Sequence, residues 1–173
     1  MQRSFLAIYL QDHHAAGVAG TRLARRIANA RATTNDLSEV ASEIHEDLAS
    51  LETIMGTLGV DPDGTKDALA RIGERLGRLK PNGRLRGRSP LSDVVELETL
   101  LVGITGKRAL WLSLRASAAA PRDVLDRLIE RAERQRTAVE EARLQAVGRV
   151  FGSGEEPTQV EDRRESLREA PTL

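Results

Sequence analysis

Hydrophobic residues recur along this chain at intervals of three and four residues, which is the period of an amphipathic α-helix. The pattern predicts four long helices, over residues 4–30, 36–58, 91–116 and 122–149. Aromatic residues make up only 2% of the chain, which leaves little material for β-strands. We therefore predict an all-α protein whose helices pack through aliphatic faces.

The stretch at 91–116, LSDVVELETLLVGITGKRALWLSLRA, is apolar nearly all round, which is typical of the central helix of a fold. One carboxylate, Glu98, lies within its apolar stripe, and a carboxylate is rarely buried unless it is paired or binds a metal. Leu100, Leu110 and Leu114 fall on the outer side of this helix. Leftover apolar surface of this kind usually marks a contact with another protein.

Two further helices carry charged residues on their predicted inward faces. In the second helix, Asp47 lies within the arc of core residues and Glu43 lies at its edge. In the fourth helix, Arg136 and Arg143 lie among the inward residues, and Glu140 lies beside them. The spacing of three or four residues allows intrahelical ion pairs along this face.

The first helix places His13 on its packing seam and His14 on its outer side. His13 is then either a core histidine with a hydrogen-bond partner or a metal ligand. Gly17 and Gly20 each cost about 1 kcal/mol relative to alanine in a helix. We predict that a neighbouring helix approaches closely at these two positions.

The connections between the helices predict how they pack. A turn of five residues separates the first two helices, which must form an antiparallel hairpin. Gly59 ends the second helix, and 59–90 is a long crossover with a short helix over 65–79. Residues 1–151 thus form one bundle domain, and 152–173 form a flexible polar tail.

The crossover is strongly basic, although the formal net charge of the whole chain is zero. We interpret this segment as a solvated basic edge. The alternative is a strip that binds nucleic acid or another polyanion, but it lacks aromatic residues and any known binding motif. Its basic residues are Arg71, Arg75, Arg78, Lys80, Arg84, Arg86 and Arg88.

Several classes of protein are disfavoured by what the chain lacks. It has no cysteine, which excludes disulfides, thiolate metal sites and cysteine nucleophiles. No serine or threonine with a nearby histidine, and no glycine-rich phosphate loop, supports hydrolase chemistry. The N-terminal apolar run is too short for a signal peptide, and no run reaches the roughly 18 apolar residues of a membrane span. We expect a soluble cytoplasmic protein without a membrane partner.

Four segments of the chain resemble a group of uncharacterised bacterial, actinobacterial-type helical proteins of the ferritin-like superfamily. The resemblance spans about residues 5–145 and implies two helical hairpins joined by one long crossover. No function of that group accompanies it. The segments are YLQDHHAAGVAGTRLARRIA, EIHEDLASLETIMGTLGV, GERLGRLKPNGRLRGRSPLSDVVELETLLVGITGKRALW and ERAERQR.

The dinuclear metal chemistry of ferritin-like proteins requires a Glu from each of two helices and a Glu-x-x-His pair from each of the other two. This chain contains no Glu-x-x-His. Folding both hairpins brings four carboxylates into one inner layer, with His13 about 13 Å further along the bundle. These carboxylates are Glu98, Asp47, Glu43 and Glu140.

Two interpretations of this carboxylate layer remain open. We favour a buried network without metal, in which Arg136 and Arg143 neutralise the carboxylates. The alternative is a divergent iron or manganese site with Glu98 and Asp47 as first ligands and Glu43 and Glu140 as second. No cofactor is favoured. We expect a non-catalytic helical protein that forms a homo-oligomer or binds a protein partner.

Overall fold

The computed structural model describes residues 2–30, 35–62 and 90–152. These residues contain no strand, so the predicted all-α architecture is confirmed, and the helix ends lie within about two residues of their expected positions. The predicted crossover helix over 65–79 and the tail beyond Gly152 lie outside the described residues. The four helices are α1 (Gln2–Ala30), α2 (Asn35–Thr57), α4 (Pro90–Ala116) and α5 (Arg122–Phe151).

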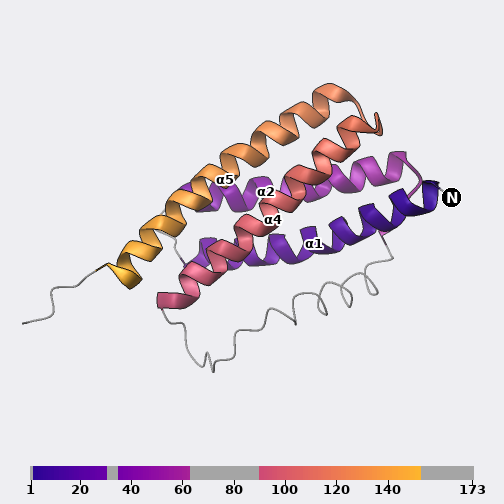
Figure 1. The fold of residues 1–173 in the computed structure, drawn as a ribbon. Coiled ribbons are helices and arrows are strands. Elements are labelled where there is room, and N and C mark those ends of the chain that lie inside the picture. Colours follow the sequence, from indigo (N-terminus) through magenta and orange to yellow (C-terminus); the bar gives the residue numbers. More distant parts are fainter. Residues whose placement is uncertain (1, 31–34, 63–89, 153–173) are drawn as a thin grey trace, which may run out of the picture.

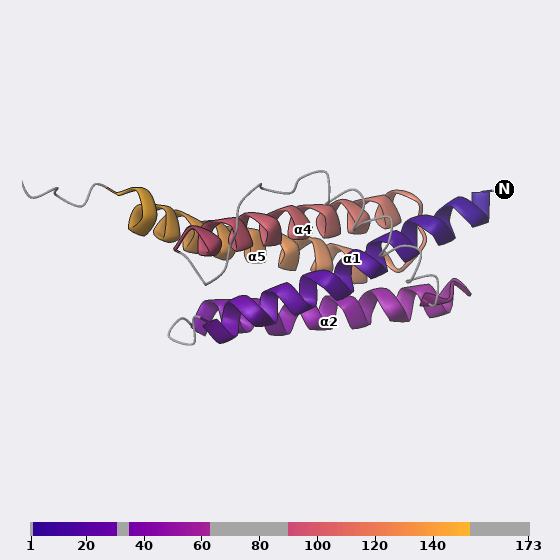
Figure 2. The same cartoon turned by 90° about the horizontal axis from the view of Figure 1, so that it is seen from below.

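The helices form two antiparallel hairpins, α1 with α2 and α4 with α5 (Figure 1). Figure 2 shows α4 and α5 at one level and α2 at the other, with α1 running obliquely between them. Across the two hairpins, α1 packs against α4 and α2 packs against α5. α2 and α4 run in the same direction, because α2 ends at the end of the bundle opposite to the one where α4 begins (Figure 1).

Two of the helices, α2 and α4, end in a residue with a positive φ angle. Gly59 (φ 69°) follows α2, which confirms the predicted stop, and Ala118 (φ 52°) follows α4. In each case the next N–H donates to a carbonyl oxygen five residues earlier, at 2.9 Å after α2 and 3.0 Å after α4. Glycine adopts this conformation freely, whereas it costs alanine about 1 kcal/mol.

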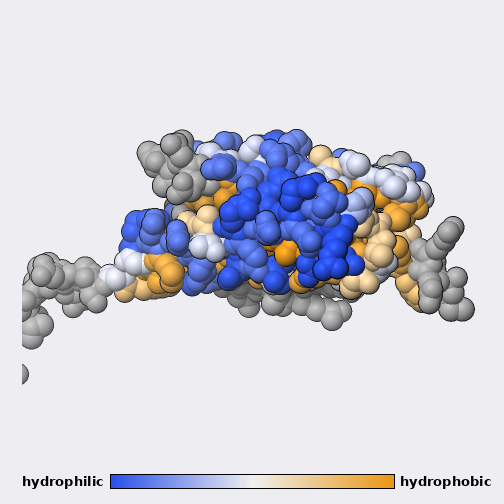
Figure 3. Space-filling model, turned by 90° about the horizontal axis from the view of Figure 1, so that it is seen from above, coloured by the Kyte–Doolittle hydropathy of each residue, from blue (hydrophilic) through white to orange (hydrophobic). Residues whose placement is uncertain are grey.

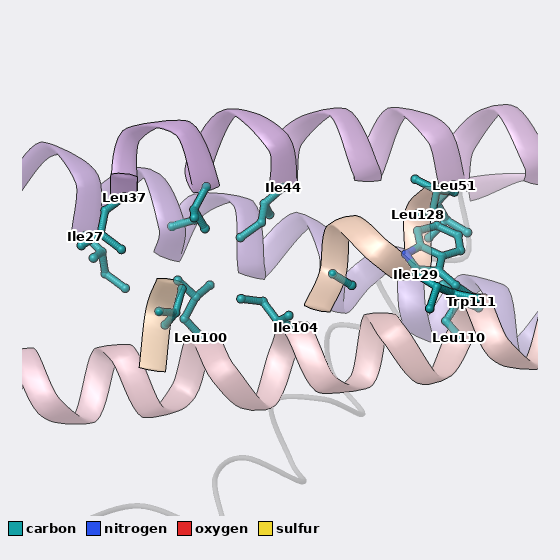
Figure 4. Close-up of a cluster of buried hydrophobic side chains, with 14 of the residues drawn as sticks. Ile27, Leu37, Ile44, Leu51, Leu100, Ile104, Leu110, Trp111, Leu128 and Ile129 are labelled. Carbon is teal, nitrogen blue, oxygen red and sulfur yellow. The ribbon is translucent and has the colours of Figure 1, made fainter. Parts of the chain in front are cut away.

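The hydrophobic core runs along the axis of the bundle, between the two hairpins (Figure 4). At one level Leu100 of α4 faces Ile27 and Leu37 of the first hairpin. Further along, Trp111 of α4 lies near Leu51 of α2, and the indole is completely buried. Burial of aliphatic side chains from all four helices is therefore the main stabilising contribution.

The predicted orientation of α4 is wrong. Leu100, Leu110 and Leu114 were expected on its outer side, but all three are buried. The helix is so widely apolar that hydropathy alone does not locate the centre of its core face. The leucines therefore contribute to the core and cannot form an external contact surface.

The core face of α1 is centred one residue later than the predicted seam. His14, expected on the outside, is buried, whereas His13 is half-buried. The close approach predicted at Gly17 is confirmed, because a Cβ atom there would lie 3.0 Å from Leu48 Cδ1. The close approach predicted at Gly20 is wrong, since a Cβ atom there would meet nothing within 4 Å. In the described part of the chain, no helix combines the length and the apolar character that a membrane span requires.

Candidate functional site

Three polar side chains interrupt the hydrophobic core and meet between α2, α4 and α5. They are Asp47, Lys107 and Gln135, one from each helix, and Asp47 and Gln135 are almost completely buried. Each occupies a core position of its helix, three or four residues from buried aliphatic neighbours such as Ile44 and Ile104. We call these three residues the Asp47 layer.

Hydrogen bonds join the three helices within the Asp47 layer. Lys107 Nζ donates to Asp47 Oδ2 and to Gln135 Oε1, the latter at 2.6 Å. Gln135 Nε2 donates to Asp47 Oδ2 (3.2 Å) and to Glu43 Oε2 (2.9 Å). The side-chain amide of Gln135 therefore links a lysine to two carboxylates.

Arg131 extends the Asp47 layer toward solvent. Arg131 Nε lies 3.3 Å from Asp47 Oδ1, an oxygen that forms an ion pair without a hydrogen bond. Arg131 Nη1 donates to Glu46 Oε2 at 2.6 Å. Two cations, Lys107 and Arg131, thus face the buried carboxylate of Asp47, so its charge is compensated within the protein.

Burial lowers the pKa of Lys107 below its ordinary value of 10.5, and the nearby carboxylate of Asp47 partly opposes this effect. The lysine side chain is 17% exposed. Its charged form therefore depends on Asp47 for compensation, because water solvates it poorly. Chemically, the layer is a self-compensating group of charges between helices.

The expected burial of Glu98 is wrong. Its side chain is 54% exposed, and Oε1 lies 3.7 Å from Arg143 Nη1. Lys107, nine residues later, occupies the position opposite Asp47. Our predicted register between α2 and α4 is therefore displaced by more than two helical turns, or about 13 Å. Glu98 lies one residue beyond the buried Leu97, on the flank of α4 that borders α5.

The ion pairs predicted along α5 are present. Arg143 Nη2 donates to Glu140 Oε1 at 2.6 Å, and Arg136 Nε donates to Glu133 Oε2 at 3.1 Å. The hydrogen bond from Arg143 holds the pKa of Glu140 below its usual value. In the described part of the chain, no hydrogen bond or ion pair joins Arg136 or Arg143 to Asp47. Lys107 and Arg131 take the neutralising role that we expected for these arginines.

The histidines of α1 lie away from the Asp47 layer. His14 Nε2 is 2.9 Å from Glu52 Oε1. The ring of His13 packs edge-on against Tyr9, with 4.5 Å between the ring centroids. Burial lowers the pKa of His13 below 6.5, and Asp12 partly opposes this.

The structure separates the carboxylates proposed as metal ligands into two groups. Glu43 joins Asp47 through Gln135, whereas Glu98 and Glu140 both pair with Arg143. Within residues 2–30, 35–62 and 90–152, no three His, Asp or Glu side chains are grouped so that they could hold a metal ion. The donor set of the predicted iron or manganese site is therefore not assembled by these residues.

The outer face of α4 is largely uncharged. It carries exposed apolar or small residues and no charge between Glu98 and Lys107, and Val102 is 71% exposed. We call this surface the α4 face. Its residues are Val95, Thr99, Val102, Gly103, Thr105, Gly106 and Ala109.

By contrast, the side of the bundle that carries α5 is covered mainly by hydrophilic residues (Figure 3). Exposed ion pairs such as Arg127–Asp123 lie along this helix. The basic residues predicted at 71–88 lie outside the described residues. The α4 face, with the exposed Val102 at its centre, is therefore a candidate protein contact site.

Sequence reasoning identified Asp47 but missed Lys107 and Gln135 as its partners. A signal for Lys107 exists, since the spacing 100, 104, 107, 111 and 114 follows the core pattern of α4 and places a lysine among buried residues. The same spacing places Gln135 between Ala132 and Val139. A polar residue at a core position of each of three helices predicts a shared polar layer.

Comparison with known proteins adds no further constraint: no protein family model, curated protein or solved structure matches the chain.

Proposed function

We propose that this protein is a ferritin-like helical bundle that acts through self-association or by binding a protein partner, rather than as an enzyme. The ferritin-like assignment is supported by the parallel course of α2 and α4, because bundles with only short loops have antiparallel consecutive helices (Figure 1). In the described residues, the charged groups of the core are engaged with one another through Asp47, Lys107 and Gln135.

The α4 face is the observation that carries the interaction role. The leucines that first suggested this role are buried, but Val102 and its neighbours leave an uncharged strip on the opposite side of the same helix. A contiguous apolar surface on an otherwise highly charged protein favours contact with another protein.

The sequence is compatible with two other functions. A divergent iron or manganese protein would use Asp47 and Glu98, but Asp47 is bonded to Lys107 and Glu98 pairs with Arg143. A polyanion-binding protein would use the arginines at 71–88, which lie outside the described residues. No observation on the described residues favours either alternative over the interaction role.

The proposal is tested by the mass of the purified full-length protein in solution. Light scattering coupled to size-exclusion chromatography at micromolar concentrations should give a mass above 18.9 kDa, or a pull-down should recover a stoichiometric protein partner. Metal analysis of the same untagged sample provides the control for the metal alternative. A strict monomer without a partner would contradict the interaction role, and tightly bound iron or manganese would favour the alternative.

A further inference from the structure

We propose that the α4 face is the surface on which a second copy of this chain binds, with the two α4 helices antiparallel about a twofold axis near Gly103. This inference rests on the proposed function and names its partner and geometry. It predicts a symmetric dimer in which each copy contributes the same strip of residues.

The first argument is the low cost of covering the α4 face. Polar groups on a buried surface must keep their hydrogen bonds. Thr99 Oγ1 already donates to the carbonyl oxygen of Val95 at 2.8 Å, and Thr105 Oγ1 donates to that of Leu101 at 2.8 Å. Both hydroxyls are satisfied within α4, so covering them does not strand a donor.

The second argument comes from the two glycines of α4. Glycine carries no side chain, so an exposed glycine leaves the backbone of its helix open to close approach. A Cβ atom on Gly103 or Gly106 would meet nothing within 4 Å, which means that neither glycine is needed for packing inside the bundle. At a helix–helix contact, small residues allow two backbones to approach closely. The surface over Gly103 and Gly106 therefore has room for the backbone of an external helix.

The third argument identifies the partner as a second copy. Glu98 and Arg108 lie five residues on either side of Gly103, or about 7 Å along the helix axis. Both lie on the flank that borders α5, since Glu98 pairs with Arg143 and Arg108 pairs with Glu133. A twofold axis through Gly103 keeps this flank on the same side and reverses the helix direction. Glu98 of each copy then lies opposite Arg108 of the other copy.

This charge pattern is self-complementary in the antiparallel arrangement. In a parallel arrangement the twofold axis runs along the helices and places the two flanks on opposite sides, so Glu98 and Arg108 gain no partner in the other copy. One helix face is a small interface, so we expect a dimer with a dissociation constant in the micromolar range rather than a permanent assembly.

The central experiment is sedimentation velocity of the full chain over a range of micromolar concentrations. Wild type should shift from monomer to dimer, and Val102→Asp should remain monomeric with an unchanged melting temperature. The matched control is Leu144→Asp, which places the same charge on an exposed apolar residue of α5 and should leave the dimer intact. If Val102→Asp self-associates as strongly as wild type does, this inference is overturned, whereas the proposed function still holds.

Charge exchange tests the antiparallel geometry. Glu98→Arg and Arg108→Glu should each weaken the dimer about tenfold, because each replaces two exposed attractive pairs by two repulsive ones. The double variant Glu98→Arg/Arg108→Glu should restore the wild-type dissociation constant. Two additive losses without restoration would overturn the geometry.

The absence of cysteine from the chain allows a clean cross-linking test. Val102→Cys lies next to the proposed axis, so mild oxidation by Cu²⁺–phenanthroline should convert it efficiently to a covalent dimer. Thr137→Cys, on the exposed side of α5, should cross-link poorly. Equal cross-linking of both would contradict the proposed interface. A monomeric wild type in which Val102→Asp lowers the melting temperature would show that another part of the same chain covers the face, and would also overturn the proposal.

Discussion

The strongest energetic prediction concerns the ion pair between Asp47 and Lys107. Asp47 is completely buried, and Lys107 donates both to its carboxylate and to Gln135. Removing one partner of a buried pair leaves the other charge uncompensated and typically costs about 3–5 kcal/mol. We therefore expect Asp47→Leu to destabilise the protein by about that amount, a large share of the roughly 5–15 kcal/mol that holds a domain folded.

Lys107→Met should fall at the lower end of this range. Arg131 Nε lies 3.3 Å from Asp47 Oδ1 and continues to compensate the carboxylate when the lysine is removed. The double variant Asp47→Leu/Lys107→Met should recover much of the loss, because two apolar side chains replace the pair and Gln135 Nε2 keeps its bond to Glu43. Full recovery is not expected, since Gln135 Oε1 loses its donor.

Urea unfolding followed by far-UV circular dichroism measures all four proteins of this double-mutant cycle. Glu98→Leu is the matched control: it makes the same kind of change at a carboxylate that is half exposed and 3.7 Å from its arginine, so it should cost less than about 1 kcal/mol. Additive single losses in the double variant, or an Asp47→Leu loss as small as the control, would refute the reasoning.

The same variants give a pH dependence with a definite sign. Because the pKa of Lys107 is lower in the folded protein than its ordinary value of 10.5, the unfolded chain binds more protons in the window between the two values. The free energy of unfolding contributed by this group therefore rises with pH through that window. The stability difference between wild type and Lys107→Met should grow as the pH is raised toward 10.5. A difference that shrinks would contradict the direction of the shift.

Two further predictions concern single residues. NMR titration should give His13 a pKa below 6.5, and Asp12→Asn should lower this pKa further, because the Asp12 carboxylate raises it. The contribution of His13 to stability should accordingly decrease as the pH falls through 6.5. A measured pKa above 6.5 would contradict the effect of its burial. At the helix ends, Ala118→Gly should stabilise the protein by about 1 kcal/mol and Gly59→Ala should destabilise it by a similar amount, because both positions have positive φ. Urea unfolding measures both changes. Effects of the same sign would refute the argument.

Helix positions and connectivity were within reach of the sequence because they depend on local patterns. The three- and four-residue spacing, Gly59 and the short first turn each act within a few residues of the chain. The burial of Asp47 could also be predicted, since the core face of α2 is narrow and well defined. Glu39 and Ser42, on the opposite side of α2, are exposed.

The orientation of α4 and its level against α2 could not be predicted in the same way. Apolar residues surround α4, so hydropathy places Glu98 and Leu100 equally well on either side. The position of one hairpin along the other depends on contacts between side chains far apart in sequence, such as Asp47 and Lys107. The hydrophobic pattern of a single helix contains no information about such contacts. Treating Lys107 as a polar residue at a core position would have supplied the missing constraint.

The Asp47 layer also has a consequence for how the two hairpins find each other during folding. Each hairpin is a local unit, but Asp47 belongs to the first and Lys107 and Gln135 belong to the second. If the hairpins docked one turn out of step, Asp47 would face a residue near Ile104 or Trp111 and would lose its lysine partner, at a cost of several kcal/mol. An aliphatic core alone would tolerate that slip far better. The layer thus raises the free energy of misaligned compact states relative to the native arrangement.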